Sequence, residues 1–248
     1  MKNIFAVLVL CCLFIVCGQS KVYAFDITVG ATTWYSWWDL EQKGQSYNID
    51  PTFLYGPALS VRLNDDFNLT FVFLYGKFDM EESHWDNSTP PVKEFQKFKL
   101  KRYDSDLALN YRLNEYFKVF AGVKYINYSF ATGGHMEHTG FGPGLGLSCA
   151  FPIVDNLFLL GTLSGFYLWA EEEDDGKNGR SSRDSKDYGI NSNLSLAYYI
   201  AQASTTVSLG GRFQYMKIDK DKRNDNDSGN QTAKFYGVTL TATYTFGF

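Results

Sequence analysis

Residues 103–113 read YDSDLALNYRL, and the fold class follows from how these letters alternate. Tyr103, Leu107, Leu109, Tyr111 and Leu113 lie on one face, whereas Asp104, Asp106, Asn110 and Arg112 lie on the other. Successive side chains of a β-strand point to opposite faces, so this stretch predicts a strand with one apolar and one charged face.

The same alternation recurs ten times between Phe25 and Phe248. The segments run about 11 to 14 residues, near the 9 to 11 that a tilted strand needs to cross a membrane and longer than most soluble strands. Among charged residues, only Lys77 and Lys217, at strand ends, share the apolar face. The charged residues on the opposite face are Arg62, Asp104, Asp106, Arg112, Lys118, Lys124 and Arg212. An apolar outside and a polar inside reverse the pattern of a water-soluble barrel.

Short and long connections alternate along the chain. Short turns are expected near 64–66, 114–116, 154–156 and 201–203, and longer polar loops near 39–51, 79–98, 129–139, 170–186 and 219–234. This is the arrangement of outer-membrane barrels, with periplasmic turns and external loops. A sheet in lipid must also bond every amide internally. We therefore predict an all-β fold, a closed antiparallel up-and-down transmembrane β-barrel of about ten strands, with eight as the alternative.

An internal repeat supports this prediction. Residues 62–67 (RLNDDF) recur at 112–117 (RLNEYF), and Gly56-Pro57 recurs as Gly142-Pro143. The unit holds two long strands rather than the four short strands of a propeller blade, so we interpret it as a hairpin. Neither proline can donate a ladder hydrogen bond.

The N-terminus has the features of an export signal. Lys2 precedes the uncharged stretch 4–16, and residues 22–24 supply a cleavage pattern before Phe25. We expect residues 1–24 to be a cleaved signal peptide and residues 25–248 to form the outer-membrane domain. The remaining chain has 21 basic and 27 acidic residues, a net charge of −6. That balance argues against a nucleic-acid partner.

The C-terminus carries the most specific feature. Phe248 is the last residue, and Phe246, Tyr244, Ala242 and Leu240 alternate behind it. This ending resembles the terminal strand of the small outer-membrane β-barrel proteins of Gram-negative bacteria. The resemblance implies an outer-membrane location among lipid and lipopolysaccharide. It also implies that Phe248, Phe246 and Tyr244 form a signal for the barrel-assembly machinery. We expect a monomer.

Asp104 and Asp106 share one face about 7 Å apart along the strand. Two close carboxylates can share a proton for acid–base catalysis. Asp-x-Asp resembles one half of the outer-membrane aspartyl protease family, but that family also uses an Asp–His couple, and no Asp-x-His occurs here. The alternative is a lumen charge network formed by Arg62, Asp104, Asp106, Lys124 and Arg212.

Two polar segments suggest metal binding. His135, Glu137 and His138 offer zinc-ligating groups, but their spacing matches no helical zinc motif, and a polar loop tip is the alternative. Residues 224–229 begin like an EF-hand loop, but Phe235 stands where the bidentate Glu belongs. We expect no cofactor.

Aromatic residues gather near the strand ends. They predict interfacial girdles, with a sugar-binding platform as the alternative. These residues are Trp34, Trp37, Trp38, Tyr75, Tyr125, Tyr128, Tyr167 and Trp169. The acidic run 171–175 leaves open divalent-ion bridging to lipopolysaccharide.

These features predict a barrel with a polar, narrow lumen and long surface loops. Its role would be structural, adhesive or that of a narrow passive route for solutes. The alternative is a hydrolase acting on lipopolysaccharide or peptides, with Asp104 and Asp106 as catalytic candidates.

Overall fold

The computed structural model describes residues 26–42, 45–86, 92–131, 135–176, 179–221 and 230–247. These residues form one antiparallel sheet of 11 strands and a single 3-10 turn, η1, at Ala201–Ala203. The strands are β1 (Asp26–Gln42), β2 (Gln45–Ile49), β3 (Thr52–Arg62), β4 (Phe67–Asp86), β5 (Val92–Arg112), β6 (Phe117–Ala131), β7 (His135–Val154), β8 (Leu157–Gly176), β9 (Gly179–Ile200), β10 (Thr205–Lys220) and β11 (Asn230–Gly247). Within these ranges, no helix is long and apolar enough to cross a membrane.

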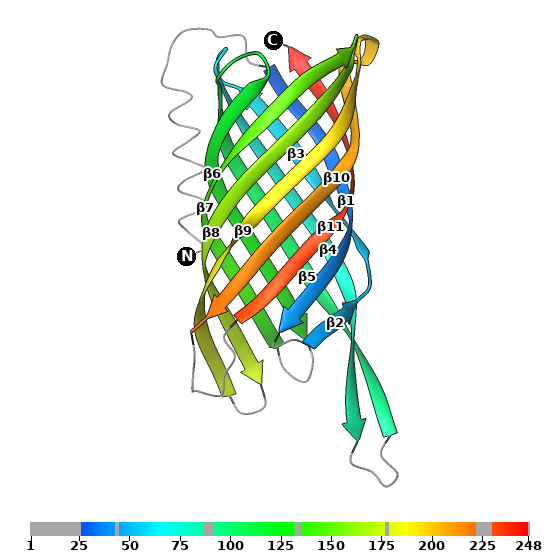
Figure 1. Cartoon of the computed structure of the whole chain (residues 1–248), viewed down its shortest axis with the longest axis vertical. Helices are drawn as coiled ribbons and strands as arrows, with labels where there is room; N and C mark the ends of the chain where they lie inside the picture. Colours follow the sequence, from blue (N-terminus) through cyan, green and yellow to red (C-terminus); the bar gives the residue numbers. More distant parts are fainter. Residues whose placement is uncertain are drawn as a thin grey trace.

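The sheet closes on itself (Figure 1). β1 pairs with β11 from Asp26↔Gly247 to Gln42↔Gln231, and it pairs with β2 and β3 on its other side. Both β2 and β3 also pair with β4, so together they fill one position in the wall. The closed ten-stranded antiparallel barrel predicted from the sequence is confirmed.

The barrel has a turn end and a hairpin end. The turn end holds the short connections, and there the internal repeat makes the same turn twice. Asn64 Oδ1 accepts hydrogen bonds from the amides of Asp66 and Phe67, at 2.9 and 2.8 Å. Asn114 Oδ1 accepts the corresponding two bonds. The repeated sequence therefore encodes a side-chain-capped turn that ends one strand and starts the next.

At the hairpin end, much of the sequence predicted as long polar loops is strand instead. β4 continues to Asp86 and β5 begins at Val92, inside the predicted loop 79–98. β8 and β9 likewise extend to Gly176 and from Gly179. Outside lipid both faces of a strand can meet water, so the alternation of polarity fades while backbone pairing continues. Figure 1 shows these extensions projecting beyond the barrel.

The two Gly-Pro steps interrupt the wall without shifting it. At Gly56-Pro57 and Gly142-Pro143 the pairing skips two residues and resumes in the same register. A Cβ atom on Gly56 would lie 2.0 Å from the carbonyl oxygen of Phe73, and one on Gly142 would lie 2.1 Å from that of Tyr167. Glycine is required at both positions because the neighbouring backbone approaches so closely.

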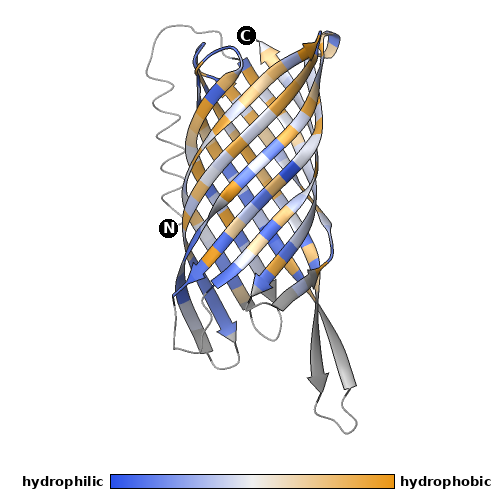
Figure 2. Ribbon diagram, viewed as in Figure 1, coloured by the Kyte–Doolittle hydropathy of each residue, from blue (hydrophilic) through white to orange (hydrophobic). Residues whose placement is uncertain are grey.

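The outer wall is apolar. Leu145, Trp169 and Leu194 are among its most exposed residues, at 67%, 62% and 60%. Figure 2 shows hydrophobic and hydrophilic residues alternating along the strands. At the hairpin end an outward aromatic belt makes two runs of ring contacts, Trp37–Tyr35–Phe53 and Tyr55–Tyr75–Tyr103.

The girdle prediction is wrong for Trp34, Trp38 and Tyr128, which are buried inside the barrel. Their positions alternate with the outward residues on β1 and β6, so they face the lumen.

Candidate functional site

Apolar side chains fill the hairpin half of the lumen. We call this set the lumen plug. It comprises Trp34, Trp38, Ile49, Leu54, Leu74, Phe78, Leu100, Ile126, Tyr128, Phe166, Leu168, Met216, Ile218, Ala233 and Phe235, all buried. The inner face at the hairpin end is therefore largely apolar, with buried polar pairs such as His138–Asp187 and Lys220–Glu172 among the plug residues, whereas the sequence predicted a polar lumen.

Rings from opposite walls meet within the plug. Tyr128 on β6 lies 5.3 Å from Trp38 on β1 and 6.3 Å from Phe235 on β11, between ring centroids. Around the wall, β7, β8, β9 and β10 lie between β6 and β11 in one direction. In the other direction β5, β4, the shared position of β2 and β3, and β1 lie between them. These contacts therefore cross the lumen rather than follow its wall.

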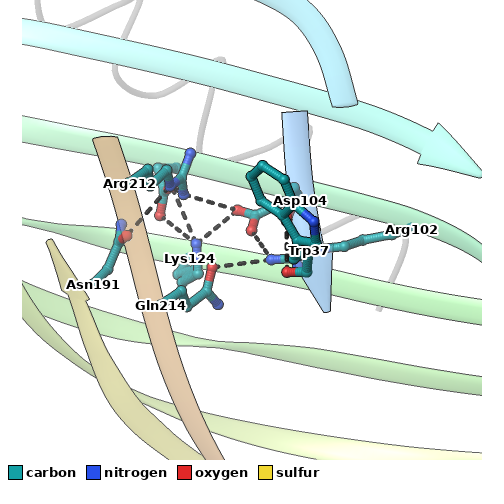
Figure 3. Close-up of polar contacts among 9 residues, drawn as sticks. Trp37, Arg102, Asp104, Lys124, Asn191, Arg212 and Gln214 are labelled. Carbon is teal, nitrogen blue, oxygen red and sulfur yellow. Dashed lines mark hydrogen bonds and ion pairs between the residues drawn. The ribbon is translucent and has the colours of Figure 1, made fainter. Parts of the chain in front are cut away.

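An ion cluster lies on the turn-end side of the plug, and Figure 3 shows the contacts among Arg102, Asp104, Lys124 and Arg212 within it. The cluster consists of Arg102, Asp104, Asp106, Lys124 and Arg212. The Asp104 carboxylate accepts hydrogen bonds from Arg102 Nη2 at 2.6 Å and Lys124 Nζ at 2.7 Å. Lys124 also donates to Asp106 at 3.0 Å. Arg212 Nη2 lies 3.6 Å from Asp106 and 3.9 Å from Asp104. The structure thus brings together four of the five residues expected in a charge network.

Arg62 is the one that lies elsewhere. It is the last residue of β3, at the turn end, where it forms an ion pair with Asp26 at 2.7 Å. It faces the lumen at its rim, which is why its alternation matched the other four. Because β3 ends at Arg62, this side chain lies at the turn end, away from the ion cluster.

Arg102 is a member that the sequence reasoning missed. It has no exposed surface, and its guanidinium carbon lies 3.7 Å from the centroid of the Phe235 ring. Its Nη2 donates to Gln214 Oε1 at 2.9 Å as well as to Asp104. Arg102 thereby joins the ion cluster to the plug through a cation–π contact. The signal was available, because Arg102 alternates in phase with Asp104.

This geometry does not favour the acid–base interpretation of Asp104 and Asp106. Asp104 is 1% exposed and faces three cations, so it is held as an ion-pair partner rather than presented to a substrate. The plug lies between it and the hairpin end. A protein carboxylate that shares a proton needs a second carboxylate as its main neighbour, and here cations occupy that place.

The candidate metal ligands are not brought together. His138 Nε2 lies 2.7 Å from Asp187 Oδ2 inside the barrel, whereas the Glu137 carboxylate, on the other face of β7, accepts from Asn127 Nδ2 at 2.6 Å. The His135 side chain lies outside the part that the structure describes. Within that part, no three potential ligands cluster as a metal site requires.

A cavity of about 380 Å³ lies on the turn-end side of the ion cluster. We call it the lumen cavity. Its lining includes Asp106, Lys118, Lys124, Asn110, Ser148 and Asn191, together with further hydroxyl and amide side chains.

On the C-terminal strand, Tyr244 and Phe246 are exposed, with ring centroids 4.6 Å apart. Phe248 lies outside the described residues.

Comparison with known proteins assigns the family. The family described as "Putative beta-barrel porin-2, OmpL-like" matches residues 24–247. The chain belongs to this porin family. It is an outer-membrane protein, as the sequence predicted. No significant match was found among curated proteins.

Among solved structures, this porin is similar to a major outer membrane protein from Thermus thermophilus. The two are 14% identical, with a TM-score of 0.44 and coverage of 90% of this chain and 100% of that one. It is also similar to the Pseudomonas putida toluene transporter TodX. There the identity is 12%, the TM-score 0.37 and the coverage 94% and 91%.

Proposed function

We propose that this porin is closed in its resting state and serves as an outer-membrane scaffold rather than a general diffusion pore. The observation that carries the proposal is the contact of Tyr128 with Trp38 and Phe235 across the lumen. A porin that conducts freely needs an aqueous channel along its axis.

Packing energetics support a stable closure. Trp34, Phe78 and Phe235 are fully buried in the plug. Truncating one such aromatic residue to alanine costs about 3–5 kcal/mol in a well-packed core. Spontaneous opening must separate several of these contacts at once, so thermal motion opens the lumen rarely. A narrow passive route for solutes would require such a displacement.

The hairpin end then supplies the working surface. With the short turns in the periplasm, the hairpins project outside the cell. The acidic run 171–175 lies on the β8 extension there. We propose that lipopolysaccharide and outer-membrane lipid surround the barrel, which is a monomer. The barrel-assembly machinery would recognise the terminal strand through Phe248, Phe246 and Tyr244.

Single-channel recording in planar bilayers tests the closure. The wild-type protein should give no steady current, and the double variant Tyr128→Ala/Phe235→Ala should give discrete conductance steps. Tyr236→Ala is the matched control, because Tyr236 neighbours Phe235 on the outward face of β11 and is 40% exposed. The control should stay silent, and heat-modifiable electrophoretic mobility verifies that each barrel is folded. Wild-type steps as large as those of the double variant would contradict the proposal.

A further inference from the structure

We propose that the lumen cavity is a binding site for a small anion that carries hydroxyl groups and enters from the periplasm. This goes beyond the closed scaffold, because the cavity lies on the turn-end side of the plug. Its volume of about 380 Å³ falls within the range of small-molecule sites. It extends along β6 from Lys118 to Lys124, a span of seven residues and roughly 20 Å along the strand.

The charges around the cavity favour an anion. In the ion cluster, three cations face two carboxylates. At the rim, Arg62 is paired with Asp26 and Arg112 with Asp66. Lys118 forms no ion pair with an acidic residue that the structure describes, and Arg112 lies directly opposite it on β5. The lumen toward the periplasm is therefore formally positive in a chain whose net charge is −4.

A cation would find no comparable site. Asp106 is the single carboxylate in the described lining, and Lys124 Nζ already contacts both its oxygens, at 3.0 and 3.1 Å. Lys118, in contrast, lines the same cavity as a cation. The ligand that neutralises the excess charge is thus an anion.

The uncharged lining indicates a hydroxylated ligand. Thr70, Asn110, Ser148, Ser164 and Asn191 line the cavity with hydroxyl and amide groups. Thr70, Ser164 and the Asn110 amide already donate to wall carbonyls, so their remaining oxygen lone pairs are acceptors for the hydroxyl groups of a ligand. Such groups hold a polar body in place, whereas a bare inorganic anion uses donors alone.

Glycine keeps the cavity open. The lumen face of β7 includes Gly142, Gly144 and Gly146, and a Cβ atom on Gly142 or Gly146 would lie within 2.3 Å of another atom. Gly144 differs, because its Cβ would meet only ordinary contacts, at 3.5 and 3.9 Å. The neighbouring backbone at Gly144 would therefore accept a side chain. Such a side chain would, however, occupy the cavity that Gly144 lines. A larger residue at this position occupies the proposed site.

Isothermal titration calorimetry of the full-length folded barrel in detergent tests the proposal. sn-Glycerol 3-phosphate is the probe. Glycerol is the matched compound without the negative charge, and inorganic phosphate is the matched compound without the alcohol groups. We expect saturable binding of sn-glycerol 3-phosphate, about tenfold weaker binding of phosphate and no binding of glycerol.

Three variants locate the site. Gly144→Leu fills the cavity and should abolish binding, while Lys118→Met should weaken it about tenfold and reduce its salt dependence. Lys101→Met removes an exposed cation outside the cavity lining on β5 and should bind as wild type does. Heat-modifiable mobility and unfolding midpoints show that each variant is folded.

The proposal is overturned if sn-glycerol 3-phosphate does not bind up to millimolar concentration, or if Gly144→Leu and Lys118→Met, both folded, keep wild-type affinity. Equal affinity for phosphate overturns the requirement for hydroxyl groups. None of these outcomes depends on bilayer conductance, so this inference and the closed lumen fail separately.

Discussion

Replacing Asp104 with Asn removes the carboxylate on which the ion cluster converges. Its two oxygens accept charge-assisted hydrogen bonds from Arg102 at 2.6 Å and Lys124 at 2.7 Å, and Arg212 lies 3.9 Å away. Asn has nearly the same shape, so the change tests charge rather than packing. In the variant, buried Arg102 keeps its positive charge without a carboxylate in contact.

The magnitude follows from burial. Removing one partner of a buried ion pair costs about 3–5 kcal/mol, because the other charge stays buried and uncompensated. Asp106 provides the comparison, since its side chain is 35% exposed and it contacts Lys124 and Arg212. An exposed pair contributes about 0–1 kcal/mol, and the partial exposure of Asp106 places it nearer that range. We expect Asp104→Asn to be at least about 2 kcal/mol more destabilising than Asp106→Asn, roughly 30-fold in the unfolding equilibrium constant.

Urea titration in phospholipid vesicles, followed by tryptophan fluorescence, measures both variants. Buried Trp34 lies 4.6 Å from the Arg212 guanidinium and reports the same region. Equal midpoints for the two variants, with equal slopes, would refute the buried cluster.

Two further predictions concern the wall. Gly142→Ala should prevent barrel formation, because its Cβ atom would lie 2.1 Å from the Tyr167 carbonyl oxygen, whereas Gly144→Ala should fold. Heat-modifiable electrophoretic mobility distinguishes the folded variant from the unfolded one. Normal folding of Gly142→Ala would contradict the close approach of the backbone. Leu145→Arg places a charge on the apolar outer face at a residue 67% exposed and should cost about 2–4 kcal/mol. Val154→Arg, at the end of β7 beside a turn, should cost about 0–1 kcal/mol in the same urea titration, and similar costs at both sites would argue against a lipid-facing wall.

The wall was predictable because lipid imposes a period of two on every strand. Residues 103–112 keep that period except at Ser105, a polar residue on the apolar face, and Ala108, an apolar residue on the charged face. The repeated turns at Asn64 and Asn114 were equally predictable, since a local side-chain cap produces them. What acts within one strand or one turn is encoded in adjacent residues.

The interior was less predictable, because residue type and position conflict there. Trp38 and Tyr128 have the composition of a girdle, but they alternate in phase with the lumen-facing residues Ser36 and Ile126. Their meeting with Phe235 depends on how the closed wall brings β1, β6 and β11 together, and no local pattern encodes that. For the same reason, the sequence alternation identified the charged lumen residues but did not show that apolar side chains from other strands bury them.

Cysteine accessibility measures closure of the lumen most directly. In a Cys149→Ser background, Ala233→Cys places a thiol in the plug and Ser148→Cys places one in the lumen cavity. A membrane-impermeant thiol reagent, applied to the folded barrel in detergent with both ends accessible, should label Ser148→Cys rapidly and leave Ala233→Cys unlabelled until denaturant is added. Labelling of Ala233→Cys in the folded barrel as fast as that of Ser148→Cys would show that water fills the whole lumen.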